Sequence, residues 1–176
     1  MSDPFSDIVN ADPEFVELWS EMLDVRAAHP RQVEMRDRYF EDIDFGGGRV
    51  LEVGCGTGAI AEALAARADT TEVIGIDPSP EFIEIARTRP TDARFQLGDA
   101  LALDFEAESF DVVIFHAVLC HLPQPDSAIA EAVRVLRAGG MLAVFDGDNC
   151  SMSVSLHADD PLAPHIAEYT AANCHD

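Results

Sequence analysis

The stretch Arg49–Gly58, with the sequence RVLEVGCGTG, constrains the fold of this chain more than any other. Val50, Leu51 and Val53 make a short apolar run of the kind that is buried in a parallel sheet, and helix-forming residues follow the last glycine directly. The three alternating glycines lack Cβ atoms, so their main-chain N–H groups can approach a ligand at the start of the helix. The stretch therefore predicts a strand, a ligand-binding turn and a helix.

The spacing of the residues around this turn narrows the class of ligand that it could bind. Glu52 lies two residues before Gly54, and Gly58 comes one residue earlier than the third glycine of the dinucleotide pattern G-x-G-x-x-G. Nineteen residues after Gly58, the next apolar run ends in Asp77, whose carboxylate can accept hydrogen bonds from both hydroxyls of a ribose. This pairing favours an adenosine-containing ligand, although dinucleotides and mononucleotides also bind to glycine turns.

Five ordered motifs within residues 46–148 resemble those of class I S-adenosylmethionine-dependent methyltransferases. In chain order they are VLEVGCGTG at 50–58, GID at 75–77, GDA at 98–100, FDVVIFH at 110–116 and RVLRAGGML at 134–142. One departure is Ala138, where the family often has a proline before the paired glycines. The resemblance implies S-adenosylmethionine as the cofactor and S-adenosylhomocysteine as its product.

Strands and helices alternate from Arg49 onward, which predicts an α/β fold with a parallel sheet covered on both faces. The resemblance implies a Rossmann-like doubly wound sheet with strand order 3-2-1-4-5 and an N-terminal helical lid. The expected strands are 50–53, 72–77, 94–97, 110–115 and 141–145, and the expected helices after the first glycine turn are 59–66, 80–88 and 126–137. Asp12 and Pro13 start a helix of about four turns, and Pro30 starts another to residue 40.

We expect three segments: an N-terminal helical cap at 1–45, a cofactor-binding domain at 46–150 and a short tail at 151–176. The cap either encloses the acceptor or only covers the sheet, because an apolar stripe on a helix fits both. The tail contains a weak strand at 152–156 and a helix at 161–172, so the usual sixth and seventh strands of the family are missing. We expect residues 152–156 to pair with the edge of strand 5, in the same chain or in a homodimer.

The predicted cofactor-binding residues lie at the ends of the expected strands. They are Glu52, Gly54, Cys55, Gly56, Gly58, Asp77, Pro78, Asp99, Ala100 and His116. The resemblance implies that Asp99 accepts from the adenine amino group and that the Ala100 N–H meets a ring nitrogen, although Asp after Gly is also typical of a turn. We expect Glu52 to orient the glycine turn and to stabilise the ammonium and sulfonium groups of S-adenosylmethionine through its negative charge. Cys55 is interpreted as a small buried residue, and the cysteine spacing indicates no metal site.

The implied chemistry is an in-line displacement at a sulfonium methyl, which needs no metal and no covalent intermediate. A weakly nucleophilic acceptor would need a general base, and the candidates are His116 and His121. Either histidine could instead be a packed side chain or, for His121, part of a helix start. The acceptor therefore decides whether a base is required.

The charge of the chain bears on the acceptor. There are 33 acidic residues against 11 arginines and no lysine, a formal net charge of −22, which would repel nucleic acids and anionic membranes. We therefore expect a small-molecule acceptor. No signal peptide or long apolar run is present, which favours a cytoplasmic location. Two alternatives stay open: a truncated or regulatory subunit that only binds S-adenosylmethionine, and a nicotinamide-dependent oxidoreductase, which the glycine spacing disfavours.

Overall fold

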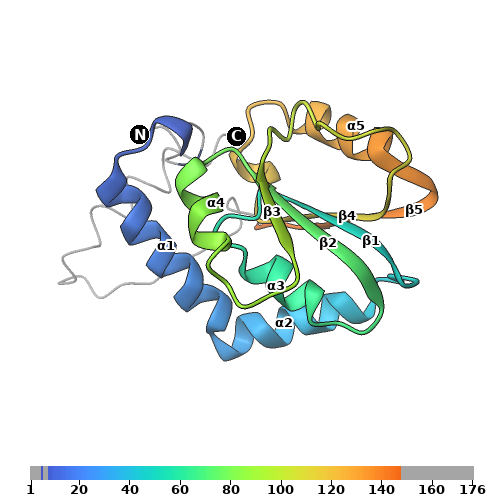
Figure 1. The fold of residues 1–176 in the computed structure, drawn as a ribbon, viewed down its shortest axis with the longest axis horizontal. Coiled ribbons are helices and arrows are strands. Elements are labelled where there is room, and N and C mark those ends of the chain that lie inside the picture. The colour runs from blue at the N-terminus through green and yellow to red at the C-terminus, as the bar shows by residue number, and fades with distance from the viewer. Residues whose placement is uncertain (1–4, 6–7, 148–176) are drawn as a thin grey trace.

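The computed structural model of this chain describes Phe5 and residues 8–147. Within them a five-stranded parallel sheet has the order β3-β2-β1-β4-β5 (Figure 1), which confirms the expected fold class. The strands are β1 (Gly48–Val53), β2 (Thr70–Asp77), β3 (Arg94–Leu97), β4 (Phe110–His116) and β5 (Leu136–Phe145). Reversal of the strand order between β1 and β4 creates the switch point at which α/β sheets bind their ligands.

The helices begin where the sequence carries caps and prolines. The Asp12 carboxylate accepts from Glu14 N–H at 2.8 Å before α1, and Ser79 Oγ accepts from Phe82 N–H at 3.2 Å before α4. The described helices are α1 (Pro13–Ala28), α2 (Pro30–Glu41), α3 (Ala59–Ala65), α4 (Pro80–Ala86) and α5 (Pro125–Val135), with short 3₁₀ turns at Ile8–Asn10 and Leu119–His121. The expected helix starts are therefore confirmed to within one residue.

The sheet separates two apolar cores. Val50 packs with α2, α3 and α4 on one face, whereas Leu51 and Val53 pack with α5 on the other (Figure 1). All three of these β1 side chains are fully buried. This alternation follows from the period of two in a strand, and burial on both faces explains why β1 is apolar from Val50 to Val53 except at Glu52.

The parallel register brings the carboxyl ends of the strands together. Val53 is opposite Ile76 of β2 and Phe115 of β4, and Asp77 is opposite Leu97 of β3. The residues that follow these positions are the glycine turn, Pro78, Gly98 and His116. One edge of the sheet therefore carries the ends of the first four motifs found in the sequence.

The region around β5 differs from expectation. Helix α5 ends at Val135 and β5 begins at Leu136, whereas the sequence suggested a helix to 137 and a strand from 141. Leu136 has an extended backbone with ψ 138°, because the paired glycines that follow disfavour another helical turn. Strand β5 is the edge of the described sheet and exposes Met141 and Val144. The strand expected at 152–156 and the helix expected at 161–172 lie outside the described residues.

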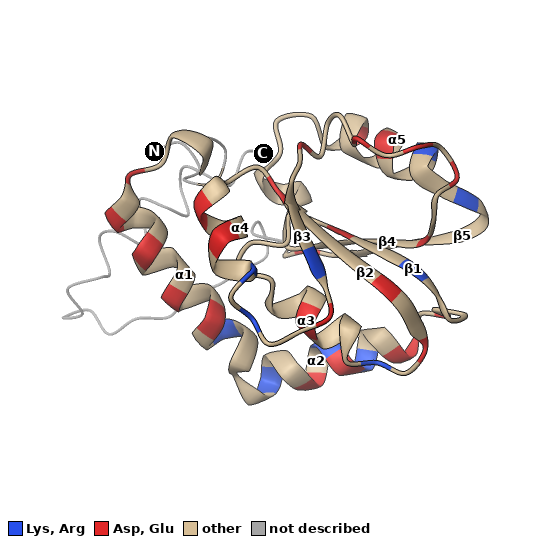
Figure 2. Cartoon of the chain, in the orientation of Figure 1, with Lys and Arg blue, Asp and Glu red and all other residues tan. Residues whose placement is uncertain are grey.

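Acidic residues are distributed over α1, α4 and α5, and arginines are few (Figure 2). Several of these arginines are paired with acids, including Arg49 with Glu72 at 2.6 Å and Arg134 with Glu131 at 2.8 Å. None of the described helices combines the length and apolar character required to cross a bilayer. The helices thus carry only part of the negative net charge of the sequence.

Candidate functional site

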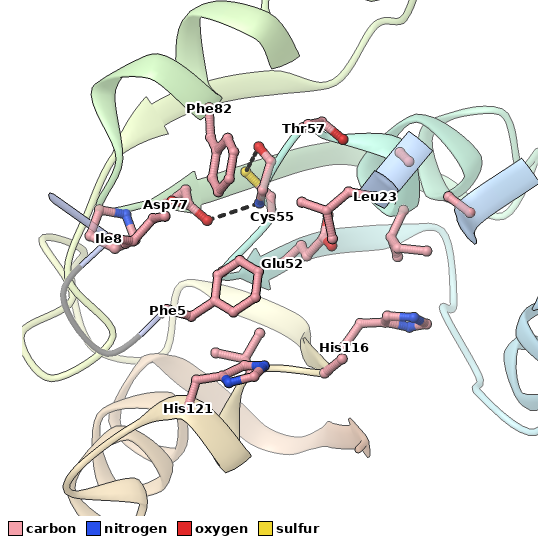
Figure 3. Close-up of a pocket in the computed structure, with 18 of the residues that line it drawn as sticks. Phe5, Ile8, Leu23, Glu52, Cys55, Thr57, Asp77, Phe82, His116 and His121 are labelled. Atoms are coloured by element: carbon pink, nitrogen blue, oxygen red, sulfur yellow. Dashed lines mark hydrogen bonds between the residues drawn. The ribbon is translucent and has the colours of Figure 1, made fainter. Parts of the chain in front are cut away.

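The glycine turn after β1 is tied to the end of β2. The N–H groups of Gly54 and Cys55 both donate to the Ile76 carbonyl at 2.8 Å. Gly56 has a positive φ of 51°, and its N–H donates to the Asp77 carboxylate at 2.9 Å (Figure 3). A Cβ at Gly54 would lie 2.6 Å from a Val118 methyl group, so glycine is required there for close approach. These hydrogen bonds therefore fix the glycine turn in place along one side of a cavity.

Asp77 is the anchor of this turn. Its second carboxylate oxygen accepts from Ser79 N–H at 2.9 Å, and the side chain is only 6% exposed. Burial raises the pKa of Asp77 to about 6, while the N–H groups of Ser79 and Gly56 act in the opposite direction. A carboxylate has about four acceptor sites, so two remain after these main-chain bonds. Asp77 can thus fix the turn and still accept two hydroxyl groups.

Gly58 and Cys55 have packing roles. Gly58 does not line the cavity: it is the N-cap of α3 with φ 82°, and a Cβ there would lie 2.7 Å from the Phe95 ring. Cys55 does line the cavity but is buried, and burial raises the pKa of its thiol well above the usual value. Its interpretation as a small buried residue therefore agrees with the geometry.

Glu52 is a buried acid in the middle of the sheet. It is 1% exposed, it lines the cavity, and its Oε2 has no hydrogen-bond partner within the described residues. Burial and the nearby Asp77 raise the pKa of Glu52 well above its usual value, while the Ala61 N–H and Arg89 lower it. A buried oxygen without a partner is costly, and a cationic ligand group in the cavity would compensate for that cost.

The turn after β3 contributes the far end of the cavity. Asp99 accepts from Leu101 N–H at 2.8 Å and is exposed, so the turn role considered from the sequence is present. Asp99, buried Ala100 and Pro78 nevertheless line the same cavity as the glycine turn. An adenine placed there would meet a carboxylate and a main-chain N–H side by side.

Ten of the eleven predicted site residues thus line one cavity, and Gly58 is the exception. They are Glu52, Gly54, Cys55, Gly56, Asp77, Pro78, Asp99, Ala100, His116 and His121. Convergence from five separate segments follows from the parallel register, which places every strand end on one edge.

His116, at the end of β4, is held by aromatic neighbours. The Tyr39 hydroxyl lies 2.9 Å from His116 Nδ1, and the Phe145 ring stacks on the imidazole at 4.9 Å between centroids. Burial and the nearby Arg26 and Arg36 lower the pKa of His116 to about 4. At neutral pH the imidazole is therefore uncharged and a weak base.

His121 lies on the other side of the cavity mouth. Its ring centroid is 4.8 Å from that of Phe5, and the two rings face the same space in Figure 3. Ile8, Trp19 and Leu23 also line the cavity, with Ile8 near Asp77 and Leu23 near Thr57 in Figure 3. The N-terminal segment thus encloses part of the cavity, and the expectation that it only covers sheet surface is incomplete.

Several polar residues of the site carry no signal in the sequence. Arg26, Gln32 and Arg36, from α1 and α2, line the cavity, and the two arginines help to lower the pKa of His116. Arg89, after α4, binds the Thr57 carbonyl of the glycine turn and Glu62 of α3, the latter at 2.8 Å. These contacts join segments far apart in the chain, so local patterns do not reveal them. The described residues hold no group of three metal-ligating side chains, so no metal site is found there.

The sequence and the fold of this chain are similar to those of known proteins. A family model described as a methyltransferase domain matches residues 51–144, which include the glycine turn, Asp77, Asp99 and His116. An uncharacterized methyltransferase of Schizosaccharomyces pombe is 30% identical over 162 residues, covering 72% of this chain and 58% of that protein. The ubiquinone biosynthesis O-methyltransferase of Xanthomonas oryzae is 36% identical over 106 residues, covering 57% of this chain and 43% of that protein.

Among solved structures, the cyclase SpnF is 30% identical, with a TM-score of 0.58 over 80% of this chain and 55% of that one. The chain thus spans about half the length of the curated relatives it matches. The matched region coincides with the sheet and with the turns that line the cavity.

Proposed function

The chain belongs to the class I S-adenosylmethionine-dependent methyltransferases, and we propose that it transfers a methyl group from S-adenosylmethionine to a small-molecule acceptor. The observation that carries the proposal is one cavity lined by two kinds of group. Three carboxylates, Glu52, Asp77 and Asp99, and a turn of bare main chain line it together with apolar and aromatic side chains. The polar groups suit a nucleoside with a cationic tail, and the apolar groups suit an organic acceptor.

The residues present fit the cofactor. In this proposal Asp77 accepts the ribose hydroxyls, Asp99 and the Ala100 N–H bind adenine, and Pro78 packs beside the sugar. The unpartnered Oε2 of Glu52 faces the positively charged part of the ligand. The bound cofactor supplies a sulfonium methyl carbon that a nucleophile can attack in line.

The protein contributes alignment and exclusion of water. Phe5, Ile8 and Trp19 cover part of the cavity and limit the access of water, and a desolvated nucleophile reacts faster with a cationic centre than a hydrated one. His121 lines the same cavity and is the candidate base for an acceptor that must lose a proton. The cap, cofactor-binding domain and tail expected at 1–45, 46–150 and 151–176 remain proposals.

The acceptor class is supported by charge and by a relative. The net charge of −22 disfavours nucleic acid and anionic membrane surfaces as substrates. A related protein is named as an O-methyltransferase of ubiquinone biosynthesis, which agrees with a small apolar acceptor. We also propose a cytoplasmic location and a homodimer through the exposed edge of β5, which light scattering of the full chain would test.

Two measurements test the proposal. Calorimetry of the full chain should show binding of S-adenosylmethionine and S-adenosylhomocysteine but not of NAD; binding of NAD alone would establish the oxidoreductase alternative. The protein is then incubated with methyl-labelled S-adenosylmethionine and a metabolite extract. Transfer of label to a small molecule is expected, and the Asp77→Asn variant should transfer less when the cofactor is limiting.

A second candidate is a protein that binds S-adenosylmethionine without methyl transfer, as a truncated or regulatory subunit would. One observation favours it: the related structure SpnF is named as a cyclase, so this fold does not by itself imply methyl transfer. Cofactor binding without label transfer in any extract would support this second function.

A further inference from the structure

The imidazole of His116 is held by aromatic stacking on its face and by a hydrogen bond at Nδ1. Phe145 stacks on the imidazole with an interplanar angle of 22°, and the Tyr39 ring lies 5.8 Å from it between centroids. Tyr39 also stacks on Phe145, at 5.1 Å and 13°. Because Tyr39 occupies Nδ1, Nε2 is the nitrogen that His116 can offer to a ligand in the cavity.

The protons of this pair can be assigned from the contacts. Burial and the charge of Glu52 raise the pKa of Tyr39, so its hydroxyl keeps its proton at neutral pH. In the described part of the chain, His116 Nδ1 is the only hydrogen-bond partner of that hydroxyl. A buried hydroxyl donates its proton when an acceptor is available, so Tyr39 donates to Nδ1 and the ring proton resides on Nε2.

The charges around His116 keep the imidazole neutral. Burial disfavours a positive charge on the ring, Arg26 of α1 and Arg36 of α2 disfavour it further, and Asp146, which follows β5, acts in the opposite direction. Gln32 lines the same cavity as the two arginines. Arg26, Arg36 and Gln32 therefore offer hydrogen-bond donors in a cavity that also contains the carboxylates of Glu52, Asp77 and Asp99.

We propose that Tyr39 is a positioning residue that holds His116 as a neutral imidazole whose Nε2–H is donated to an oxygen of the methyl acceptor. This rests on the function proposed above and names the substrate class: small molecules with a carbonyl, carboxylate or phenolate oxygen. His116 then orients the acceptor and does not remove its proton. A base role would need the opposite tautomer, with the lone pair on Nε2 and the Tyr39 proton donated elsewhere.

Nitrogen-15 NMR of histidine-labelled full chain tests the tautomer in the absence of any ligand. The chain has six histidines, and His116→Gln identifies the His116 signals. We expect a proton on Nε2 of His116 that is unchanged between about pH 5 and about pH 8. The Tyr39→Phe variant should show a mixture of tautomers, while His121→Gln, the matched control, should leave the His116 signals unchanged. A proton on Nδ1 in the unmodified protein would overturn the proposal, whether or not Tyr39→Phe folds.

The direction of the hydrogen bond is tested with two probes of similar shape. The protein is saturated with S-adenosylhomocysteine, and benzoate, an acceptor, or benzylammonium, a donor, is titrated in. We expect benzoate to shift the Nε2–H signal and benzylammonium to leave it in place. A shift with benzylammonium, or with neither probe, contradicts the proposal. So does a shift caused by S-adenosylhomocysteine alone that benzoate does not change, because the cofactor's carboxylate would then occupy the donor.

The tautomer of His116 and the proposed function are tested by separate measurements, so either proposal can be wrong without the other. Calorimetry with S-adenosylhomocysteine reports on the cofactor, whereas the tautomer of His116 is measured without it. Cofactor binding together with the Nδ1–H tautomer would retain the methyltransferase and remove Tyr39 from the positioning role.

Discussion

The guanidinium of Arg89 forms an ion pair with the carboxylate of Asp24, although the two residues are 65 positions apart in the sequence. Asp24 lies on α1, and it also accepts the Thr57 hydroxyl of the glycine turn at 2.7 Å. Arg89 contacts the same turn and Glu62 of α3. The Arg89 side chain thus joins α1, the glycine turn and α3.

The Arg89→Met variant should lose this junction while keeping an apolar stem. We expect the free energy of unfolding to fall by about 1–2 kcal/mol, a modest value because Asp24 and Glu62 are partly solvated. S-adenosylhomocysteine should also bind more weakly, since α1 and the turn are no longer held together. Urea unfolding and calorimetry measure both effects. The control is Arg94→Met, because Arg94 is 76% exposed in its pair with Glu72, and no change beyond about 0.5 kcal/mol is expected.

The Asp77→Asn variant tests the anchor of the turn. An amide keeps one acceptor oxygen but places an NH₂ group against the N–H of Gly56 or Ser79, so one main-chain donor loses its partner. We expect S-adenosylhomocysteine to bind at least about tenfold more weakly by calorimetry, equivalent to about 1.4 kcal/mol. Asp92→Asn, at an exposed position, should bind as the unmodified protein does. Equal affinity in Asp77→Asn would remove this carboxylate from the site.

Cofactor affinity should depend on pH through Asp77. Its pKa in the folded protein, about 6, is above the ordinary value, so the carboxyl becomes protonated as the pH falls through 6. Ribose hydroxyls need the ionised form as acceptor, and affinity should therefore decrease by about tenfold from pH 7.5 to pH 5. Calorimetry at both pH values measures this, with Asp77→Asn expected to give a flat profile. Tighter binding at the lower pH would refute the assigned role.

Glu52→Gln should have opposite effects on stability and binding. A neutral amide avoids the cost of an ionised buried carboxylate, so the free energy of unfolding should rise by about 1–3 kcal/mol near pH 8. Near pH 5 the gain should be smaller, because the raised pKa of Glu52 lets the carboxyl be neutral there at little cost. S-adenosylmethionine should bind about tenfold more weakly, since a positive charge loses its counter-ion. A variant that is both less stable and unchanged in binding would show that Glu52 is only structural.

The sequence predicted the parts of the site that are local. The glycine turn, the capped helix after Ser79 and the acids at strand ends are encoded within a few residues, and the parallel register then brings them together. The contact between Tyr39 and His116 spans 77 positions, and the contact between Arg89 and Asp24 spans 65. Such pairs depend on how α1 and α2 pack against the sheet, and no periodicity or spacing carries that information.

The start of β5 shows that some local features are also not predictable from the sequence. The sequence predicts a helix to residue 137 and a strand from residue 141, but Gly139 and Gly140 already lie within β5. Gly139 has φ 82°, so it introduces an irregularity that a strand with side chains would not tolerate there. Composition alone does not distinguish a turn from a strand of this kind.

The division of the cavity between strand ends and the N-terminal segment has an evolutionary consequence. Phe5, Ile8 and Trp19 belong to a part of the chain that contributes no strand to the sheet. New acceptor preferences could therefore arise by exchange of this segment while the strand ends that carry Asp77 and Asp99 are inherited unchanged. Asp24 is one position that such an exchange would have to conserve, because it joins the helix to Thr57 of the glycine turn and to Arg89.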